Sequence, residues 1–392
     1  MHRTLLWLAI GAFAIGSEGL MIAGILPRIA HDFDIPVAQA GSLVTIFSLT
    51  YAVGSPLIAV ATANWERRTL LTAAMGLFAL ANLAAATAPG FVLLALGRAL
   101  LALSAAAFMP AASAYAAMAV APQMRGRALA FVYSGMTVAL VIGVPLGAAV
   151  AAHLGWRSTF IGVAGLSAAA LAGIHFKLPP VPNPRPAGLA ERFAVARRPE
   201  VLAVISLTVL VLAGAFSVYT FIGAYLETAF AVPPTMVALF LILAGVAGAL
   251  GNTLGGYAAD RWNRRRFLTL ILLILTVAFA SVSVIPNALP GVFGLAAIAV
   301  VICVWGLFGW AFPALQQVRL LSIDPSLASI TLGLNASAIY LGSAAGAAIG
   351  SLNVEAHSVA AIGWVGAAFE AGALTFLVIT QRGEMRPAPA AG

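Results

Sequence analysis

Three ionisable side chains lie inside long apolar stretches of the sequence, where a charge is costly. Glu18 lies in "IGAFAIGSEGLMIAGIL", Arg98 in "VLLALGRALLAL" and Glu370 in "GWVGAAFEAGALTFL". A carboxylate in such surroundings must face a cavity, find a partner or take up a proton. An arginine keeps its charge at ordinary pH, so it can hold an anion or tune a nearby carboxyl but cannot carry a proton. These residue types therefore indicate proton or anion binding in an apolar medium.

The position of each group within its apolar stretch suggests a role. Glu18 falls near the middle of its stretch, and we interpret it as a proton-binding carboxyl; the alternative is a carboxyl that is only hydrogen-bonded or open to water. Arg98 lies nearer one end of its apolar stretch. The alternative to a role in anion binding is therefore a side chain that extends to the polar surface at that end. For Glu370 we expect a structural partner or local hydration.

Apolar stretches of about twenty residues, long enough as helices to cross a hydrocarbon layer roughly 30 Å thick, recur along the whole chain. Of 392 residues, 62% are hydrophobic and 8% are charged, which excludes an ordinary soluble domain. The stretches are continuously apolar, which favours helices over the alternating strands of a barrel. We predict an all-α polytopic membrane protein with twelve transmembrane helices, at residues 5–28, 38–62, 69–88, 91–119, 128–152, 158–177, 201–225, 235–258, 267–286, 290–317, 327–352 and 358–380.

The distribution of charge predicts the orientation of the chain. Seventeen of the twenty Lys and Arg residues fall on the side that carries the N-terminus, whereas Arg28 and Arg157 fall on the other side and Arg98 lies within a span. The positive-inside rule then places both termini in the cytoplasm. The net charge of +8 reflects this topology and contact with anionic membrane lipid, so no nucleic-acid partner is expected.

Other kinds of site and signal are not expected. Cys303 is the only cysteine and the histidines are scattered, so the sequence predicts neither an intramolecular disulfide nor a metal site, and no cofactor. A cleaved leader is not expected either, because the first apolar run continues past Ala14 to Ile29.

The chain divides into two related halves. Residues 178–200 form a central cytoplasmic loop between an N-terminal six-helix bundle (1–177) and a C-terminal six-helix bundle (201–392). The Pro-rich start of this loop predicts a semi-rigid linker, and its basic end a short surface helix. A shift of 197 residues superimposes Trp65 on Trp262, and Arg67 and Arg68 on Arg264 and Arg265. The shared offset indicates two bundles related by a pseudo-twofold axis, with a site at their interface.

Several phrases carry a resemblance to a known family. "GGYAADRWNRRR" at 255–266 is similar to the signature G-x-L-A-D-R-x-G-R-R, and "LGRALLAL", "GVPLG" and "GWRSTF" occur in the expected order around it. With these motifs the chain resembles the major facilitator superfamily over essentially its whole length. "IGSEGLMIAGILPRIAHDF" and "FMPAASAYAAM" resemble the bacterial twelve-helix drug:proton antiporter branch, in the group related to arabinose-efflux permeases.

The resemblance implies a function and a set of site residues. It implies a monomeric secondary transporter, not an enzyme, that exports a small amphipathic compound across the bacterial inner membrane in exchange for protons. It also gives Arg98 a coupling role, in addition to the proton-binding role inferred for Glu18. The spans that the family places around the centre supply the substrate-cavity candidates Met21, Tyr51, Met109, Tyr133, Phe216, Tyr219, Trp305, Gln316, Asn335 and Tyr340. The cytoplasmic-gate candidates are Arg67, Arg68, Gly256, Asp260, Arg261, Arg264 and Arg265, and the helix-kink candidates are Gly143, Pro145 and Gly147.

The first copy of the loop phrase departs from the signature. Ala63 stands where the signature has Asp, Asn64 replaces the following Arg and Glu66 replaces Gly, whereas the second copy keeps Asp260 and Arg261. We therefore expect the second copy to carry most of the cytoplasmic closure, and Glu66 to contribute little. The fifth-span phrase keeps only part of its family motif, and Ala102 replaces a glycine that follows the arginine.

Other functions stay open at this point. The amides and hydroxyls among the cavity candidates also suit an exporter of a polar metabolite such as a sugar, nucleoside or amino acid, and a non-transporting receptor is a further alternative. An intramembrane enzyme is disfavoured, because Ser134 lacks the glycine of a nucleophile turn and the sequence has no H-E-x-x-H motif.

Overall fold

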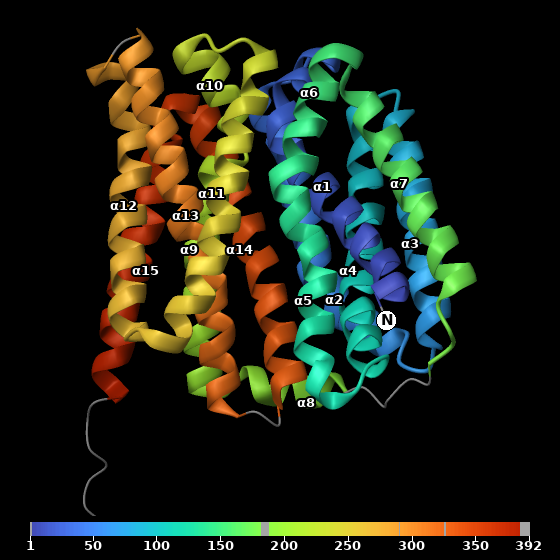
Figure 1. Cartoon of the computed structure of the whole chain (residues 1–392). Helices are drawn as coiled ribbons and strands as arrows, with labels where there is room; N and C mark the ends of the chain where they lie inside the picture. Colours follow the sequence, from blue (N-terminus) through green and yellow to red (C-terminus); the bar gives the residue numbers. More distant parts are fainter. Residues whose placement is uncertain (1, 182–187, 290, 325–326, 385–392) are drawn as a thin grey trace, which may run out of the picture.

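The computed structural model describes residues 2–181, 188–289, 291–324 and 327–384, and every regular element within them is a helix (Figure 1). Twelve helical spans of this part are long and apolar enough to cross a membrane, so the predicted fold class is confirmed. The Pro-rich start of the central loop, from 182 to 187, lies outside the described residues, as does Arg386.

The first six spans begin at the N-terminus and end before the central loop. They comprise α1 (His2–Asp32), α2 (Val37–Ala61), α3 (Arg67–Ala86), α4 (Phe91–Met118), a fifth span built from α5 (Arg125–Val138), η2 (Ala139–Gly143) and α6 (Val144–Leu154), and finally α7 (Trp156–Lys177). A short turn, η1 (Pro122–Met124), precedes the fifth span.

The second six spans follow the short helix α8 (Leu189–Ala196). They comprise α9 (Pro199–Tyr219), α11 (Pro234–Arg261), α12 (Arg264–Ala288), α13 (Gly291–Ile323), α14 (Ala328–Ala356) and α15 (Ile362–Glu384). The stretch predicted as one helix at 201–225 is divided, because α9 ends at Tyr219 and a separate helix, α10 (Ile222–Phe230), follows. The turn η4 (Val359–Ala361) precedes α15.

The three kink candidates of the fifth span lie in or just after an irregular helical turn. Residues 139–143 form a π-helical turn, and Pro145 follows it in the first turn of α6, where a missing backbone N–H is tolerated. A Cβ at Gly143 would overlap the Ser17 hydroxyl, and one at Gly147 would lie 3.0 Å from Met21 Cβ. The two glycines therefore let the fifth span approach α1 closely.

The two ends of the bundle differ in how the halves meet. We call the end that carries α8 and the α2–α3 and α11–α12 turns the basic end, and the end that carries α10 the opposite end (Figure 1). The helix α11 packs against η2 and α6, which form the opposite-end part of the fifth span, but not extensively against α5. Also toward the opposite end, a Cβ at Gly41 would lie 2.8 Å from Ser351 Oγ, across the contact of α2 with α14. The fifth and eighth spans thus pack on each other at the opposite end, and their contact does not continue extensively along α5 toward the basic end.

The two charged turns at the basic end are capped at equivalent positions. The Glu66 carboxylate accepts hydrogen bonds from the backbone N–H groups of Arg68 (2.8 Å) and Thr69 (2.9 Å) and so caps α3. The Asn263 side chain accepts one from the N–H of Arg266 (3.0 Å) and caps α12. Positions 66 and 263 differ by 197, the offset of the sequence repeat. The repeat therefore preserves an N-cap, although the residue type changes.

Glu66 also holds the start of the central loop. Its carboxylate accepts a hydrogen bond from the N–H of Val181 (3.1 Å), and the Tyr115 hydroxyl donates to the carbonyl of Pro179 (2.9 Å). Burial raises the pKa of Glu66, but the surrounding N–H donors outweigh burial and leave the pKa below its ordinary value of 4.5. The motif comparison did not anticipate this role.

We predict that Glu66→Ala lowers the free energy of unfolding by about 1 to 2 kcal/mol, because it removes an N-cap. Asn263→Ala is the matched control and should cost less, since it leaves the loop contact intact. Because the pKa of Glu66 is lowered in the fold, its stabilisation is present above about pH 4.5 and lost as the pH falls through the lower folded value. Thermal unfolding in detergent as a function of pH measures both effects. Equal shifts for the two variants would contradict the loop-holding role.

Candidate functional site

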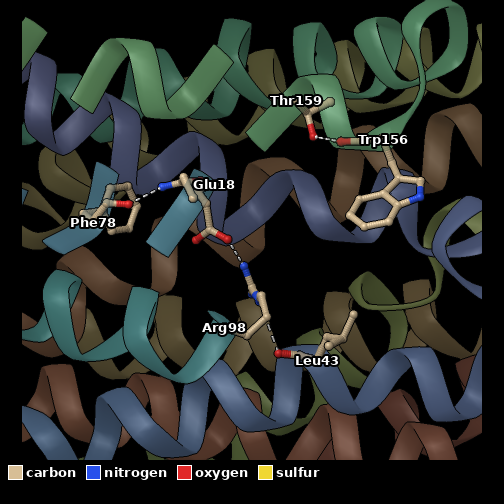
Figure 2. A network of polar contacts seen from close by, with 7 residues as sticks. Glu18, Leu43, Phe78, Arg98, Trp156 and Thr159 are labelled. Atoms are coloured by element: carbon tan, nitrogen blue, oxygen red, sulfur yellow. Dashed lines mark hydrogen bonds and ion pairs between the residues drawn. The ribbon is translucent and has the colours of Figure 1, made fainter. Parts of the chain in front are cut away.

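Glu18 and Arg98 form an ion pair in the interior of the first bundle. Figure 2 shows the Glu18 carboxylate on α1 directed at the Arg98 guanidinium on α4. Both side chains are completely buried. An isolated charge in this place would be very costly, so each group stabilises the ionised form of the other. Arg98 therefore does not extend to the membrane surface.

The helix α2 holds the arginine from its other side. Arg98 Nε lies 3.5 Å from the carbonyl oxygen of Leu43 (Figure 2), and the guanidinium carbon lies 4.4 Å from the centre of the Phe47 ring. A cation over an aromatic face is stabilised by the ring quadrupole. The pair can form further hydrogen bonds, because Glu18 Oε2 and one terminal guanidinium nitrogen of Arg98 have no hydrogen-bond partner within the described residues.

Tyr340 lies next to the ion pair and connects the two halves. Its ring on α14 stacks on that of Tyr51 on α2, with the ring centres 3.7 Å apart. The Tyr340 ring centre also lies 6.2 Å from that of Phe47, the residue that contacts Arg98. Tyr133 on α5 is 48% exposed, and the Ser113 hydroxyl donates to it across 3.3 Å. Two cavity candidates, Tyr51 and Tyr340, thus meet where the halves touch, beside the Glu18–Arg98 pair.

A second polar cluster lies inside the C-terminal spans. The Thr208 hydroxyl on α9 donates to Asn335 Oδ1 on α14 (3.0 Å), and Gln316 Nε2 on α13 donates to the Thr208 hydroxyl and to the carbonyl of Val204 (3.0 Å each). Arg319 donates to Gln316 Oε1 (2.9 Å). Gln316 and Asn335 are buried, so in this arrangement their amides join three helices.

The remaining cavity candidates are apolar or aromatic. Tyr219 on α9 lies 5.6 Å from Phe216 and 5.9 Å from Trp305 on α13 between ring centres, and its hydroxyl donates to the carbonyl of Leu20 on α1 (3.0 Å). This hydrogen bond joins the two halves two residues beyond Glu18. Met21 packs near Gly147, and Met109 on α4 is buried.

The gate candidates lie at the basic end and are mostly exposed. Asp260 is exposed, and its carboxylate makes no hydrogen bond or ion pair with the part of the chain that the structure describes. Arg261 lies over the Tyr257 ring, with 4.8 Å between its guanidinium carbon and the ring centre. Arg67 is half-buried, Arg264 and Arg265 are exposed, Arg68 contributes its backbone N–H to the α3 cap, and a Cβ on Gly256 would meet open space.

Two contributors were missed by sequence reasoning. Phe47 stands four residues before Tyr51 and therefore on the same face of α2, a spacing that would have identified it. Thr208 is a hydroxyl in the apolar run "VISLTVLVL", where a polar atom needs a partner. Among the described residues, no cluster of His, Cys, Asp and Glu is suited to hold a metal ion.

Comparisons with known proteins agree with this architecture. The sequence matches the Major Facilitator Superfamily over residues 7–347. It is 34% identical to an uncharacterized MFS-type transporter, YbcL, of Bacillus subtilis, covering 92% of this chain and 91% of that protein. It is 33% identical to the inner membrane transport protein YdhP of Escherichia coli K12, covering 91% and 90%.

Solved structures share the fold at low sequence identity. A bacterial homolog of the human lysosomal transporter Spinster, in an inward-facing and occupied conformation, superimposes with a TM-score of 0.79 at 17% identity and 98% coverage of both chains. A D-xylose–proton symporter gives a TM-score of 0.77 at 14% identity and 96% coverage of both.

The buried ion pair predicts a non-additive pattern of stability. Glu18→Gln leaves the Arg98 charge unpaired and Arg98→Gln leaves the Glu18 charge unpaired, so each should lower the free energy of unfolding by about 3 to 5 kcal/mol. The double variant removes both charges and should recover much of that loss. Thermal unfolding of the four proteins in one detergent measures the effect, with the surface variant Glu191→Gln as control. Additive losses in the double variant would rule out the energetic coupling.

Proposed function

Because this chain belongs to the Major Facilitator Superfamily, we propose that it exports a small amphipathic compound in exchange for protons by alternating access. It is a multi-pass transporter of the bacterial inner membrane and not an enzyme. The observation that carries the proposal is the buried Glu18–Arg98 pair, which lies beside the Tyr51–Tyr340 stack that joins the two halves.

Protonation of Glu18 is the proposed switch. A proton that binds the carboxylate cancels its charge, ends the ion pair and leaves Arg98 as an uncompensated buried cation. The arginine then favours an arrangement with another acceptor or with water. Tyr340 belongs to the second half and packs near Phe47, whose ring lies against the Arg98 guanidinium, so an arginine that moves after protonation of Glu18 disturbs the contact between the halves.

The proton gradient supplies the energy for export. One elementary charge that moves down a membrane potential of 100 mV releases about 2.3 kcal/mol. An obligatory exchange follows if the substrate and the proton favour opposite charge states of Glu18. A cationic or hydrogen-bonding substrate would favour the ionised carboxylate, and its departure would leave that carboxylate ready to be protonated.

The substrate class follows from the side chains near the pair. The aromatic faces of Tyr51, Tyr340, Phe216 and Trp305 suit an apolar body, and the hydroxyls of the tyrosines supply a few hydrogen bonds. Methionine side chains such as that of Met109 are flexible and adapt to apolar ligands of different shapes. This mixture favours an amphipathic compound and makes drug resistance an expected phenotype of the host.

The alternative is an exporter of a polar metabolite. The observation that favours it is the hydrogen-bonded hydroxyl pair of Ser113 and Tyr133. This pair lies near Tyr340 and suits a sugar or nucleoside hydroxyl. The fold similarity to a sugar–proton symporter is compatible with either class.

The proposal includes the orientation and closure of the protein. We propose that the basic end faces the cytoplasm, with both termini there and with its arginines near anionic lipid head groups. Asp260 is then available to meet the basic-end part of the fifth span when that side closes. The remaining gate arginines would stabilise the same closure, and the protein is proposed to work as a monomer.

Transport into proteoliposomes tests the proposal. With an imposed pH gradient, lipophilic cationic dyes should accumulate against their own gradient at a rate that falls at least tenfold in Glu18→Gln, because the switch is lost. Glu191→Gln is the matched carboxylate control and should transport normally. A panel of labelled sugars, nucleosides and amino acids in the same vesicles tests the alternative. Transport that ignores the pH gradient, or persists unchanged in Glu18→Gln, overturns the proton coupling.

A further inference from the structure

A second buried carboxyl lies in the C-terminal spans, and none of the described residues neutralises it. Glu370 is near the middle of α15, completely buried, and neither of its oxygens has a hydrogen-bond partner within the described residues. Glu18 has the same burial but is paired with an arginine. The expected structural partner of Glu370 is therefore absent from the described part of the chain.

Two glycines make the space that the carboxyl occupies. A Cβ on Gly214 of α9 would lie 2.9 Å from Glu370 Oε1 and 3.0 Å from the carbonyl oxygen of Gly366. A Cβ on Gly366 of α15 would lie 3.0 Å from the Phe279 ring and 3.2 Å from the carbonyl oxygen of Gly214. The carboxyl thus lies in a notch between α9 and α15, beside Gly214, at a place where the two helices pack closely and backbone carbonyls are nearby. Those carbonyls accept hydrogen bonds but cannot neutralise an anion.

No cation of the described residues reaches this notch. The titratable side chains on the elements packed against α15 are Glu200 and Tyr219 on α9, Arg264, Arg265 and Arg266 on α12, Tyr340 and Glu355 on α14, and His357 before η4. None of them makes a hydrogen bond or an ion pair with the Glu370 carboxyl. An ionised carboxylate without a partner is very costly here, so the carboxyl carries a proton in this arrangement.

The notch is mechanically connected to the coupling site. Gly214 lies on the same helix as Tyr219, whose hydroxyl donates to the Leu20 carbonyl near Glu18. Since Gly214 and Tyr219 are on one helix, a shift of α9 relative to α15 that breaks this hydrogen bond also moves the glycine away from Glu370. Water that enters the opened notch can accept the proton: the carboxyl O–H bond breaks and a solvated carboxylate remains.

We propose that Glu370 is a second proton-binding site, which holds its proton while α9 packs on α15 and exchanges it when α9 moves. The site is separate from the Glu18–Arg98 pair. It does not depend on proton coupling through Glu18, and its test uses no transported substrate.

Infrared difference spectroscopy of the full-length protein in lipid tests this site. The wild-type protein should show the C=O band of a protonated carboxylic acid, and this band should move to lower wavenumber in D2O and be lost in Glu370→Gln. It should persist in Glu18→Gln. A wild-type spectrum without the band, or a band that does not respond to D2O, overturns the proposal.

A second pair of variants keeps the test valid if Glu370→Gln fails to fold. Gly214→Ala crowds the carboxyl and should shift the frequency of the same band, whereas Gly372→Ala, on α15 with open space around its Cβ position, should leave it unchanged. Equal spectra for the two variants would mean that the band does not arise from Glu370.

Discussion

A charge placed in an apolar interior costs free energy, and the packing of these helices must offset that cost. Of the ionisable groups inside the spans, Glu18 and Arg98 meet this cost together, through an ion pair that joins α1 to α4 and an aromatic contact with α2. Close packing of α1 on the fifth span, through Gly143 and Gly147, fixes the helix that carries the carboxylate. A pair held in this way stabilises one arrangement and becomes unfavourable when a proton removes one charge. The same interaction can therefore serve stability and switching.

The two halves differ in how each accommodates a buried carboxyl. In the first half the buried carboxyl has an arginine, whereas in the second half Glu370 lies in a glycine notch without a cation. The loop phrases differ in a similar way. Glu66 caps a helix and holds the central loop, while Asn263 caps its counterpart and leaves Asp260 exposed. The caps thus stand at equivalent positions of the two halves, while the contacts of each turn differ.

Hydropathy alone predicts the twelve spans, because a continuous apolar run has few other stable structures in a membrane. The sequence also identifies Glu18 and Arg98 as costly groups. It does not show that they pair, since they are eighty residues apart on helices that are apolar all round, which leaves the rotation of each helix undetermined. For the same reason the contact of Tyr51 with Tyr340 and the link of Thr208 to Asn335 required the structure. The division of the seventh span after Tyr219 was also missed, because both parts are apolar.

We propose that protonation of Glu18 changes the distance between the two halves at each end of the bundle. Electron–electron spin distance measurements test it most directly, with labels at Asn64 and Arg264 on the basic end and at Gln39 and Thr235 on the opposite end, after Cys303→Ser. All labelled proteins also carry Glu370→Gln, so that the second carboxyl contributes no proton binding to the pH response. We expect that lowering the pH shifts the two distance distributions in opposite directions, and that adding Glu18→Gln fixes the low-pH distributions at every pH. A pH response that is unchanged in Glu18→Gln would contradict it.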